Sequence, residues 1–184
     1  MVDIAVMVGS SGQDAVEKFK AQKMFINSLI NRLDISKDTG QIASVLYEKE
    51  PLIMSRIGEN VDRTTTKQTF DVIRNSLFSG NMDKALRLVK DTVFSVNQGA
   101  RSQAPKSILM FIDTKAIGDG KKIDQLAKEF KDQNTKLVIV ALGQDIDQAT
   151  LKTLAYDQQS IFFPPSLEEL QKMVEPVAKA LLPG

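Results

Sequence analysis

The chain has 184 residues, of which 42% are hydrophobic and 26% charged, and its formal net charge is +1. This length and balance predict one globular domain over residues 1–184, with a core that needs no disulfide bonds. The charge is near zero and forms no basic stripe, so neither nucleic acid nor a membrane surface is an expected partner. No apolar run approaches the 18 residues of a membrane span, and no signal peptide is visible before the first strand-like run.

Cysteine and histidine are both absent. This excludes a disulfide framework, a Cys/His zinc site, and Cys–His or Ser–His–Asp catalysis within the chain. Any general acid or base would have to be Asp, Glu, Lys or Tyr.

Short apolar runs alternate with helical patterns along the chain. Residues 41–50 alternate at period two, and residues 51–57 follow so closely that only an antiparallel hairpin fits. Residues 107–113 and 136–142 are near-continuous apolar runs, typical of parallel strands buried on both faces. The remaining expected elements are strands over residues 4–8 and 160–163, a long first helix whose apolar residues recur from Phe19 to Leu33, and helices over residues 67–77, 83–94, 123–130, 149–155 and 166 onward.

This order predicts an α/β fold: a doubly wound, mostly parallel six-stranded sheet with one antiparallel edge strand and helices on both faces. In the last helix, Ser166 and Glu169 form a capping-box pattern, and Pro176 should kink or fray the helix. Ligands of such sheets bind outside the carboxyl ends of the strands. We call the loops expected there, residues 9–13, 80–83, 113–120 and 143–147, the rim.

The first rim loop, Gly9-Ser10-Ser11-Gly12-Gln13, has the small residues of a turn that could cradle a phosphate on its backbone amides. It also loosely resembles the phosphate loop of flavodoxins. It does not match G-x-G-x-x-G or the Walker pattern, and the chain has no Trp and only two Tyr to enclose a flavin. A small-ligand or phosphate-binding α/β protein, using residues 9–13, is one alternative for the function.

Two longer stretches point elsewhere. The run from Asp3 through Val8 into Gly9–Gln13, and the GAR…PK approach of residues 99–106 into the strand 107–113, resemble a von Willebrand factor A domain of the extracellular-matrix type. The resemblance covers essentially the whole chain. It implies a secreted, extracellular protein and a non-enzymatic adhesion or protein-interaction module. The implied partners are other matrix proteins, collagen or neighbouring A domains.

Members of this family often carry a metal-ion-dependent adhesion site with an Asp-x-Ser-x-Ser loop, a Thr from a second loop and an Asp after the central strand. Read onto this chain, Gly9, Gln13 and Met82 replace three expected ligands, and only Ser11 and Asp113 remain. Mg²⁺ needs near-octahedral oxygen coordination, so two scattered ligands do not suffice. We therefore expect a vestigial site, no cofactor and a static scaffold, with Asp113 as a structural tether for the first loop. The alternative is a non-standard Mg²⁺ site that recruits Gln13 or Asp83.

Overall fold

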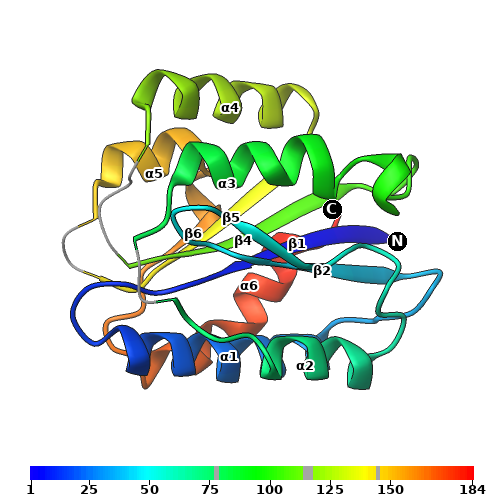
Figure 1. Cartoon of the computed structure of the whole chain (residues 1–184), viewed down its shortest axis with the longest axis horizontal. Coiled ribbons are helices and arrows are strands. Elements are labelled where there is room, and N and C mark those ends of the chain that lie inside the picture. The colour runs from blue at the N-terminus through cyan, green and yellow to red at the C-terminus, as the bar shows by residue number, and fades with distance from the viewer. Residues whose placement is uncertain (77–78, 114–117, 144–145) are drawn as a thin grey trace.

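A computed structural model describes residues 1–76, 79–113, 118–143 and 146–184. A six-stranded sheet crosses the middle of the molecule (Figure 1). The strands are β1 (Val2–Val8), β2 (Gly40–Leu46), β3 (Leu52–Ser55), β4 (Lys106–Ile112), β5 (Lys136–Ala141) and β6 (Ile161–Phe162). Their order in the sheet is β3-β2-β1-β4-β5-β6. Strand β3 pairs antiparallel with β2 at one edge, and the other neighbours pair parallel. The predicted sheet, including its antiparallel edge strand, is confirmed.

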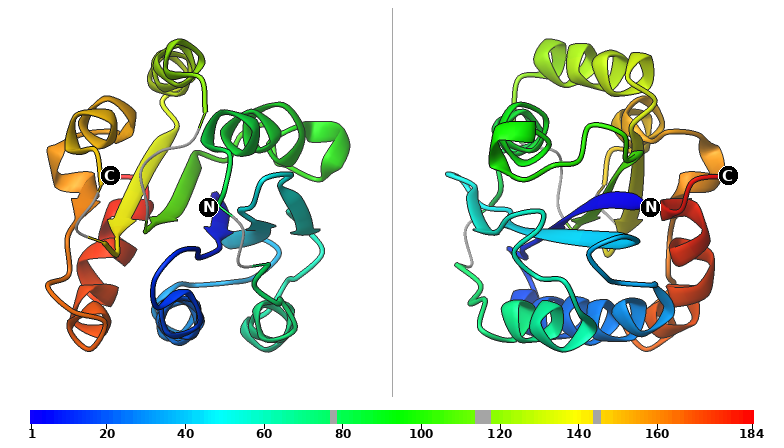
Figure 2. Two further views of the ribbon diagram at one scale, coloured as in Figure 1. Left: turned by 60° about the vertical axis from the view of Figure 1, so that its left-hand side comes forward. Right: turned by 90° about the vertical axis from the view of Figure 1, so that its right-hand side faces the viewer.

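The helices form a layer on each face of the sheet. Helices α1 (Ala15–Arg32), α2 (Arg63–Asp71) and α6 (Val174–Leu181) lie on one face, and α3 (Met82–Leu88), α4 (Gly120–Asp132) and α5 (Gln148–Leu154) lie on the other (Figures 1 and 2). Short 3-10 segments over Val96–Gln98 and Gln158–Ser160 connect some of these elements.

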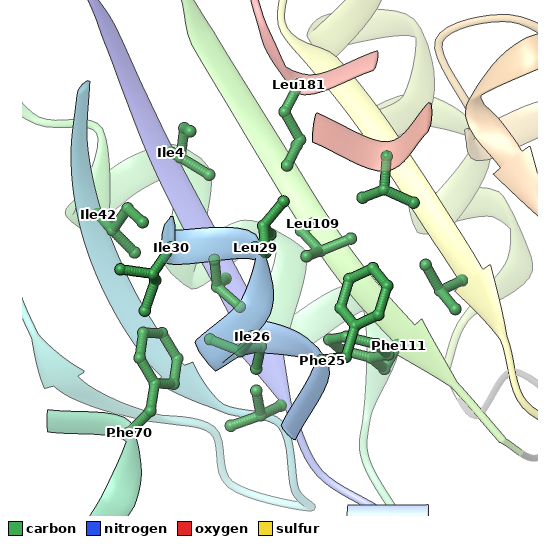
Figure 3. Close-up of a cluster of buried hydrophobic side chains, with 14 of the residues drawn as sticks. Ile4, Phe25, Ile26, Leu29, Ile30, Ile42, Phe70, Leu109, Phe111 and Leu181 are labelled. Carbon is green, nitrogen blue, oxygen red and sulfur yellow. The ribbon is translucent and has the colours of Figure 1, made fainter. Parts of the chain in front are cut away.

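The central strands are apolar on both sides because each side faces a layer of helices. All seven residues of β1 are buried, as are the last six of β4. On the α1 side, the rings of Phe25 and Phe111 meet edge to face with their centroids 5.7 Å apart. Figure 3 shows this cluster, with Leu29 of α1 beside Leu109 of β4 and Leu181 at the end of α6.

Helix α2 is displaced from its predicted position, whereas α3 lies close to its own. Helix α2 begins at Arg63 because the Asp62 side chain accepts a hydrogen bond from the Thr65 amide at 2.8 Å, and it ends at Asp71. The predicted helix over residues 67–77 is therefore displaced, and residue 77 lies outside the described residues. Helix α3 continues as a π-helical turn over Val89–Val93, which brings the helical segment close to its predicted end.

The final helix is divided rather than continuous. A 3-10 segment over Glu169–Met173 precedes α6, and the Glu169 amide donates to Ser166 Oγ at 3.3 Å, which is one half of the predicted capping box. Pro176 is the third residue of α6. The first turn of an α-helix tolerates proline, and the change of helix type falls at Val174, two residues before Pro176.

The C-terminal end of α6 is fixed with respect to the sheet. Its last turn lies at the starts of β4 and β5, where Ser107 Oγ donates to the Leu181 carbonyl at 2.6 Å. The starts of these parallel strands lie at the end of the sheet opposite the rim. Within the described parts of the chain, no helix combines the length and the apolar character needed to cross a bilayer.

Candidate functional site

The rim lies where β1 and β4 end and α3 begins. Its described residues are the first loop, Gly80 to Asp83, Asp113, residues 118–120, and residues 143, 146 and 147. Residues 114–117 and 144–145 of the predicted rim lie outside the described residues. Tyr47, directly after β2, borders the rim, because its amide donates to the Val8 carbonyl at 2.6 Å.

Asp113 ties the end of β4 to the first loop. Its Oδ2 atom accepts a hydrogen bond from the Ser11 amide at 2.9 Å and a short one from Ser10 Oγ. The structure thus brings Ser11 and Asp113 together, but through the backbone of Ser11, and Ser10 supplies the hydroxyl. The Ser11 hydroxyl accepts instead from Ser79 Oγ at 3.4 Å. One carboxylate oxygen therefore holds the loop in place, as a tether would.

Two buried or half-buried amide side chains hold the first loop from the other side. Gln22 of α1 accepts from the Gly9 amide at 3.1 Å and donates to the Gly9 carbonyl at 2.9 Å. Asn75 does the same for Ser10, at 3.0 and 2.9 Å. Three consecutive amides, those of Gly9, Ser10 and Ser11, are therefore already paired with side-chain oxygens. A phosphate cradle needs such amides to point at the ligand, so this geometry disfavours the phosphate and flavin alternative.

The other two positions of the adhesion-site pattern place one side chain in the core and one in solvent. Met82 is the first residue of α3 and is fully buried in the core on the α3 side of the sheet, among side chains that include Met7 and Ala85. Gln13 is exposed at the end of the loop. Asp83 is nearly buried, and its Oδ1 accepts from the Asp119 amide at 3.1 Å, which fixes the start of α4.

Tyr47 is the titratable group most perturbed by this setting. Its half-buried phenol donates to the Gly80 carbonyl at 3.4 Å. Burial raises the pKa of Tyr47 well above its usual range, and the negative charges of Asp113 and Asp83 raise it further. The phenol is therefore a neutral hydrogen-bond donor at physiological pH.

The described residues fit a divalent cation poorly. Nowhere among them do three or more acidic side chains gather as metal ligands would. Among the described residues, every buried side-chain nitrogen and oxygen has a hydrogen-bond partner. No buried side-chain oxygen there is therefore unpaired and available as a metal ligand. Mg²⁺ would have to displace the serine donors from Asp113 and still find most of its six oxygens elsewhere.

Sequence reasoning missed Ser10, Gln22, Asn75 and Tyr47. Only Gln22 has a readable signal, because it is a polar residue on the apolar stripe of α1 between Phe19 and Ile26. Such a side chain must find hydrogen-bond partners when the stripe is buried.

A profile described as von Willebrand factor type A domain matches residues 3–176. Collagen alpha-1(XII) chain of Notophthalmus viridescens is 26% identical over 163 residues, which cover 87% of this chain and 17% of that protein. Matrilin-1 of Bos taurus is 25% identical over 148 residues, covering 79% of this chain and 26% of that protein. The chain thus spans only a minor part of the length of these curated relatives.

Two solved structures share the fold at low identity. Proximal thread matrix protein 1 from the mussel byssus, with a zinc-occupied MIDAS motif, has a TM-score of 0.85 and 18% identity, covering 97% of this chain and 45% of that one. The manganese-loaded TRAP protein of Plasmodium vivax has a TM-score of 0.78 and 17% identity, covering 97% of this chain and 73% of that one.

Proposed function

The chain belongs to the von Willebrand factor type A domain family, and we propose that it is a non-enzymatic module that binds other structural proteins without a metal ion. The observation that carries the metal-independent part is the state of Asp113. Its carboxylate is engaged by Ser10 and Ser11 of the same chain. A contact made by this domain would then use polar and apolar surface instead of a metal-bridged carboxylate.

The proposed partners are other matrix proteins, collagen or neighbouring A domains, and the proposed location is extracellular. The support is the kind of protein that the relatives are: a collagen chain and matrilin-1 of several species among the similar sequences, and a thread matrix protein among the similar structures. We further propose that residues 1–184 form one domain of a larger assembly, since the similar region is a minor part of each curated relative.

The test is binding of the full chain to immobilised collagen and to a matrilin A domain, measured in Mg²⁺ and again in EDTA. We expect equal binding in both conditions, and equal binding by Asp113→Asn, which keeps an acceptor for the Ser11 amide but removes the charge. Asp124→Asn, an exposed change in α4, is the control. Binding that is lost in EDTA would overturn the proposal.

The rival candidate is a Mg²⁺-dependent adhesion domain with a non-standard site. It is favoured by the two structural neighbours, one with zinc at its MIDAS and one loaded with manganese. Thermal melting with Mg²⁺, Mn²⁺, phosphate or a flavin separates the candidates. A ligand at 100 times its Kd adds about 2.7 kcal/mol to the folded state, which is a shift of several degrees. We expect no such shift with any of the four.

A further inference from the structure

We propose that the rim is sealed by Tyr47, whose main chain packs on Gly9 and whose ring packs on Gly80. Neither glycine position can then carry a side chain, so replacing the missing ligand residues does not by itself recreate a cation site. The inference deepens the proposed metal independence and rests on it. It adds that the rim is closed by its backbone packing and not only by the loss of ligands.

Gly9 is pressed against the main chain of Tyr47. A Cβ added to Gly9 would lie 3.2 Å from the carbonyl carbon of Tyr47. It would lie much closer than 3.0 Å to the carbonyl oxygen, and real Cβ atoms essentially never come that close to another heavy atom. The obstacle is backbone, so no change of rotamer relieves it. The Tyr47 amide donates to the Val8 carbonyl, and Gln22 and Gly9 exchange two hydrogen bonds. These contacts hold the two chain segments at this separation.

Gly80 is pressed against the ring of the same tyrosine. A Cβ there would stand 2.5 Å from Cζ and 2.7 Å from Cδ2 of Tyr47. The loop around Gly80 is held beside the end of β2, because the Asn81 amide donates to the Glu48 carbonyl at 3.2 Å. Here the obstacle is a side chain, so removing the ring removes the clash.

Close approach, and not backbone conformation, requires these two glycines. The glycines with positive φ among the described residues are Gly12, Gly58, Gly99 and Gly118, and neither Gly9 nor Gly80 is among them. A different residue at position 9 or 80 would therefore be acceptable to the backbone dihedrals, and the close approach of Tyr47 excludes it. The close approach of Tyr47 thus accounts for glycine at both positions.

The consequence concerns the lost carboxylate. An aspartate at position 9 would need the ends of β1 and β2 to separate, at the expense of the Val8–Tyr47 hydrogen bond. The Asp113 carboxylate would also have to release Ser10 and Ser11 before it could face a cation. We therefore expect that a Gly9→Asp/Gln13→Ser chain still binds no divalent cation.

The first experiment is a set of double-mutant cycles on thermal stability. Gly9→Ala and Gly80→Ala are each made in the wild-type chain and in a Tyr47→Leu background. Each single alanine should lower Tm by on the order of 5 °C. Tyr47→Leu should rescue Gly80→Ala and should not rescue Gly9→Ala, because leucine removes the ring but keeps the carbonyl.

Gly120→Ala is the control, since a Cβ at Gly120 would meet nothing within 4 Å. It should leave Tm unchanged or slightly raised, as expected for alanine in a helix. Gly9→Ala or Gly80→Ala as stable as the wild type would overturn the seal, and so would rescue of Gly9→Ala by Tyr47→Leu.

The second experiment is Mn²⁺ titration, by calorimetry and electron paramagnetic resonance, of wild type and of Gly9→Asp/Gln13→Ser. The double variant leaves the buried Met82 in place and so spares the core. No saturable Mn²⁺ binding is expected from either chain. Saturable Mn²⁺ binding by the folded double variant alone would overturn the seal and leave the proposed function standing. Loss of collagen or matrilin binding in EDTA would instead overturn the proposed function. If the double variant does not fold, the alanine cycles decide, because they test the clash without a carboxylate.

Discussion

Gln22 uses both atoms of its side-chain amide on a single residue: Gly9 donates to its Oε1 at 3.1 Å, and its Nε2 donates to the Gly9 carbonyl at 2.9 Å. Gln22 is fully buried, and it stands on the face of α1 that otherwise packs apolar side chains on the sheet. The main chain of Gly9 therefore has its hydrogen bonds completed by a helix and not by a neighbouring strand. This contact sets where β1 ends and the rim begins.

Replacing Gln22 with methionine keeps the volume and removes both hydrogen bonds. The N–H and C=O of Gly9 would then be buried without these partners, which costs about 1–3 kcal/mol for each group. We expect the free energy of unfolding in urea to fall by about 2–4 kcal/mol. Gln68→Met, an exposed change in α2, should stay within about 0.5 kcal/mol of wild type. A Gln22→Met chain as stable as that control would show that Gly9 finds other partners.

At the starts of the parallel strands, opposite the rim, Asp3 is fully buried between two cations. Its carboxylate lies 2.7 Å from Arg101 Nη2 and 3.0 Å from Lys106 Nζ, and it also accepts from the Arg101 amide at 2.8 Å. Asp3→Ala leaves both cations without their counter-charge, and breaking a buried pair costs about 3–5 kcal/mol. Urea unfolding checks this value against Asp91→Ala, whose pair with Lys90 is exposed and should contribute less than about 1 kcal/mol. Equal effects of the two changes would contradict the burial argument.

The sheet could be predicted from sequence because its central strands are buried on both faces. Continuous apolar runs in β4 and β5 leave little other choice, and the short connection between β2 and β3 permits only a hairpin. Asp113 could also be placed at the rim, since it directly follows such a run. These inferences use only the order and spacing of apolar residues.

The contacts of the rim could not be predicted, because they depend on loop geometry. Whether Ser10 or Ser11 faces Asp113 depends on a turn in which Gly12 and Asp14 both have positive φ. Met82 aligns with a ligand position by residue count, yet the first turn of α3 directs it into the core. Tyr47 carries no motif at all, and its role follows only from the close approach of β2 to Gly9 and Gly80.

Helix α6 should stay in place when a partner or a cation is added. Its end is bound to two strands: Ser107 Oγ donates to the Leu181 carbonyl and Lys136 Nζ to the Leu182 carbonyl, each at 2.6 Å. We expect hydrogen exchange of the α6 amides to be unchanged by Mg²⁺ or by collagen. Ser107→Ala should speed that exchange and lower stability by about 1–3 kcal/mol, because a buried carbonyl loses its donor. Faster exchange in the wild-type chain after ligand addition would contradict a static scaffold.

The start of α2 should depend on acid pH through Asp62. The Thr65 amide, which donates to the carboxylate at 2.8 Å, is the main cause that lowers the pKa of Asp62 below its ordinary value of 3.8. Since the folded pKa lies below the unfolded one, the cap stabilises α2 fully above the unfolded value and is lost as pH falls through the folded value. In an NMR titration, the Thr65 amide shift should follow the Asp62 carboxyl with a midpoint below 3.8. Asp62→Asn keeps an accepting oxygen but does not titrate, so its Thr65 amide should stay constant over the same range. A Thr65 amide that still moves in Asp62→Asn would assign the titration to another carboxyl group.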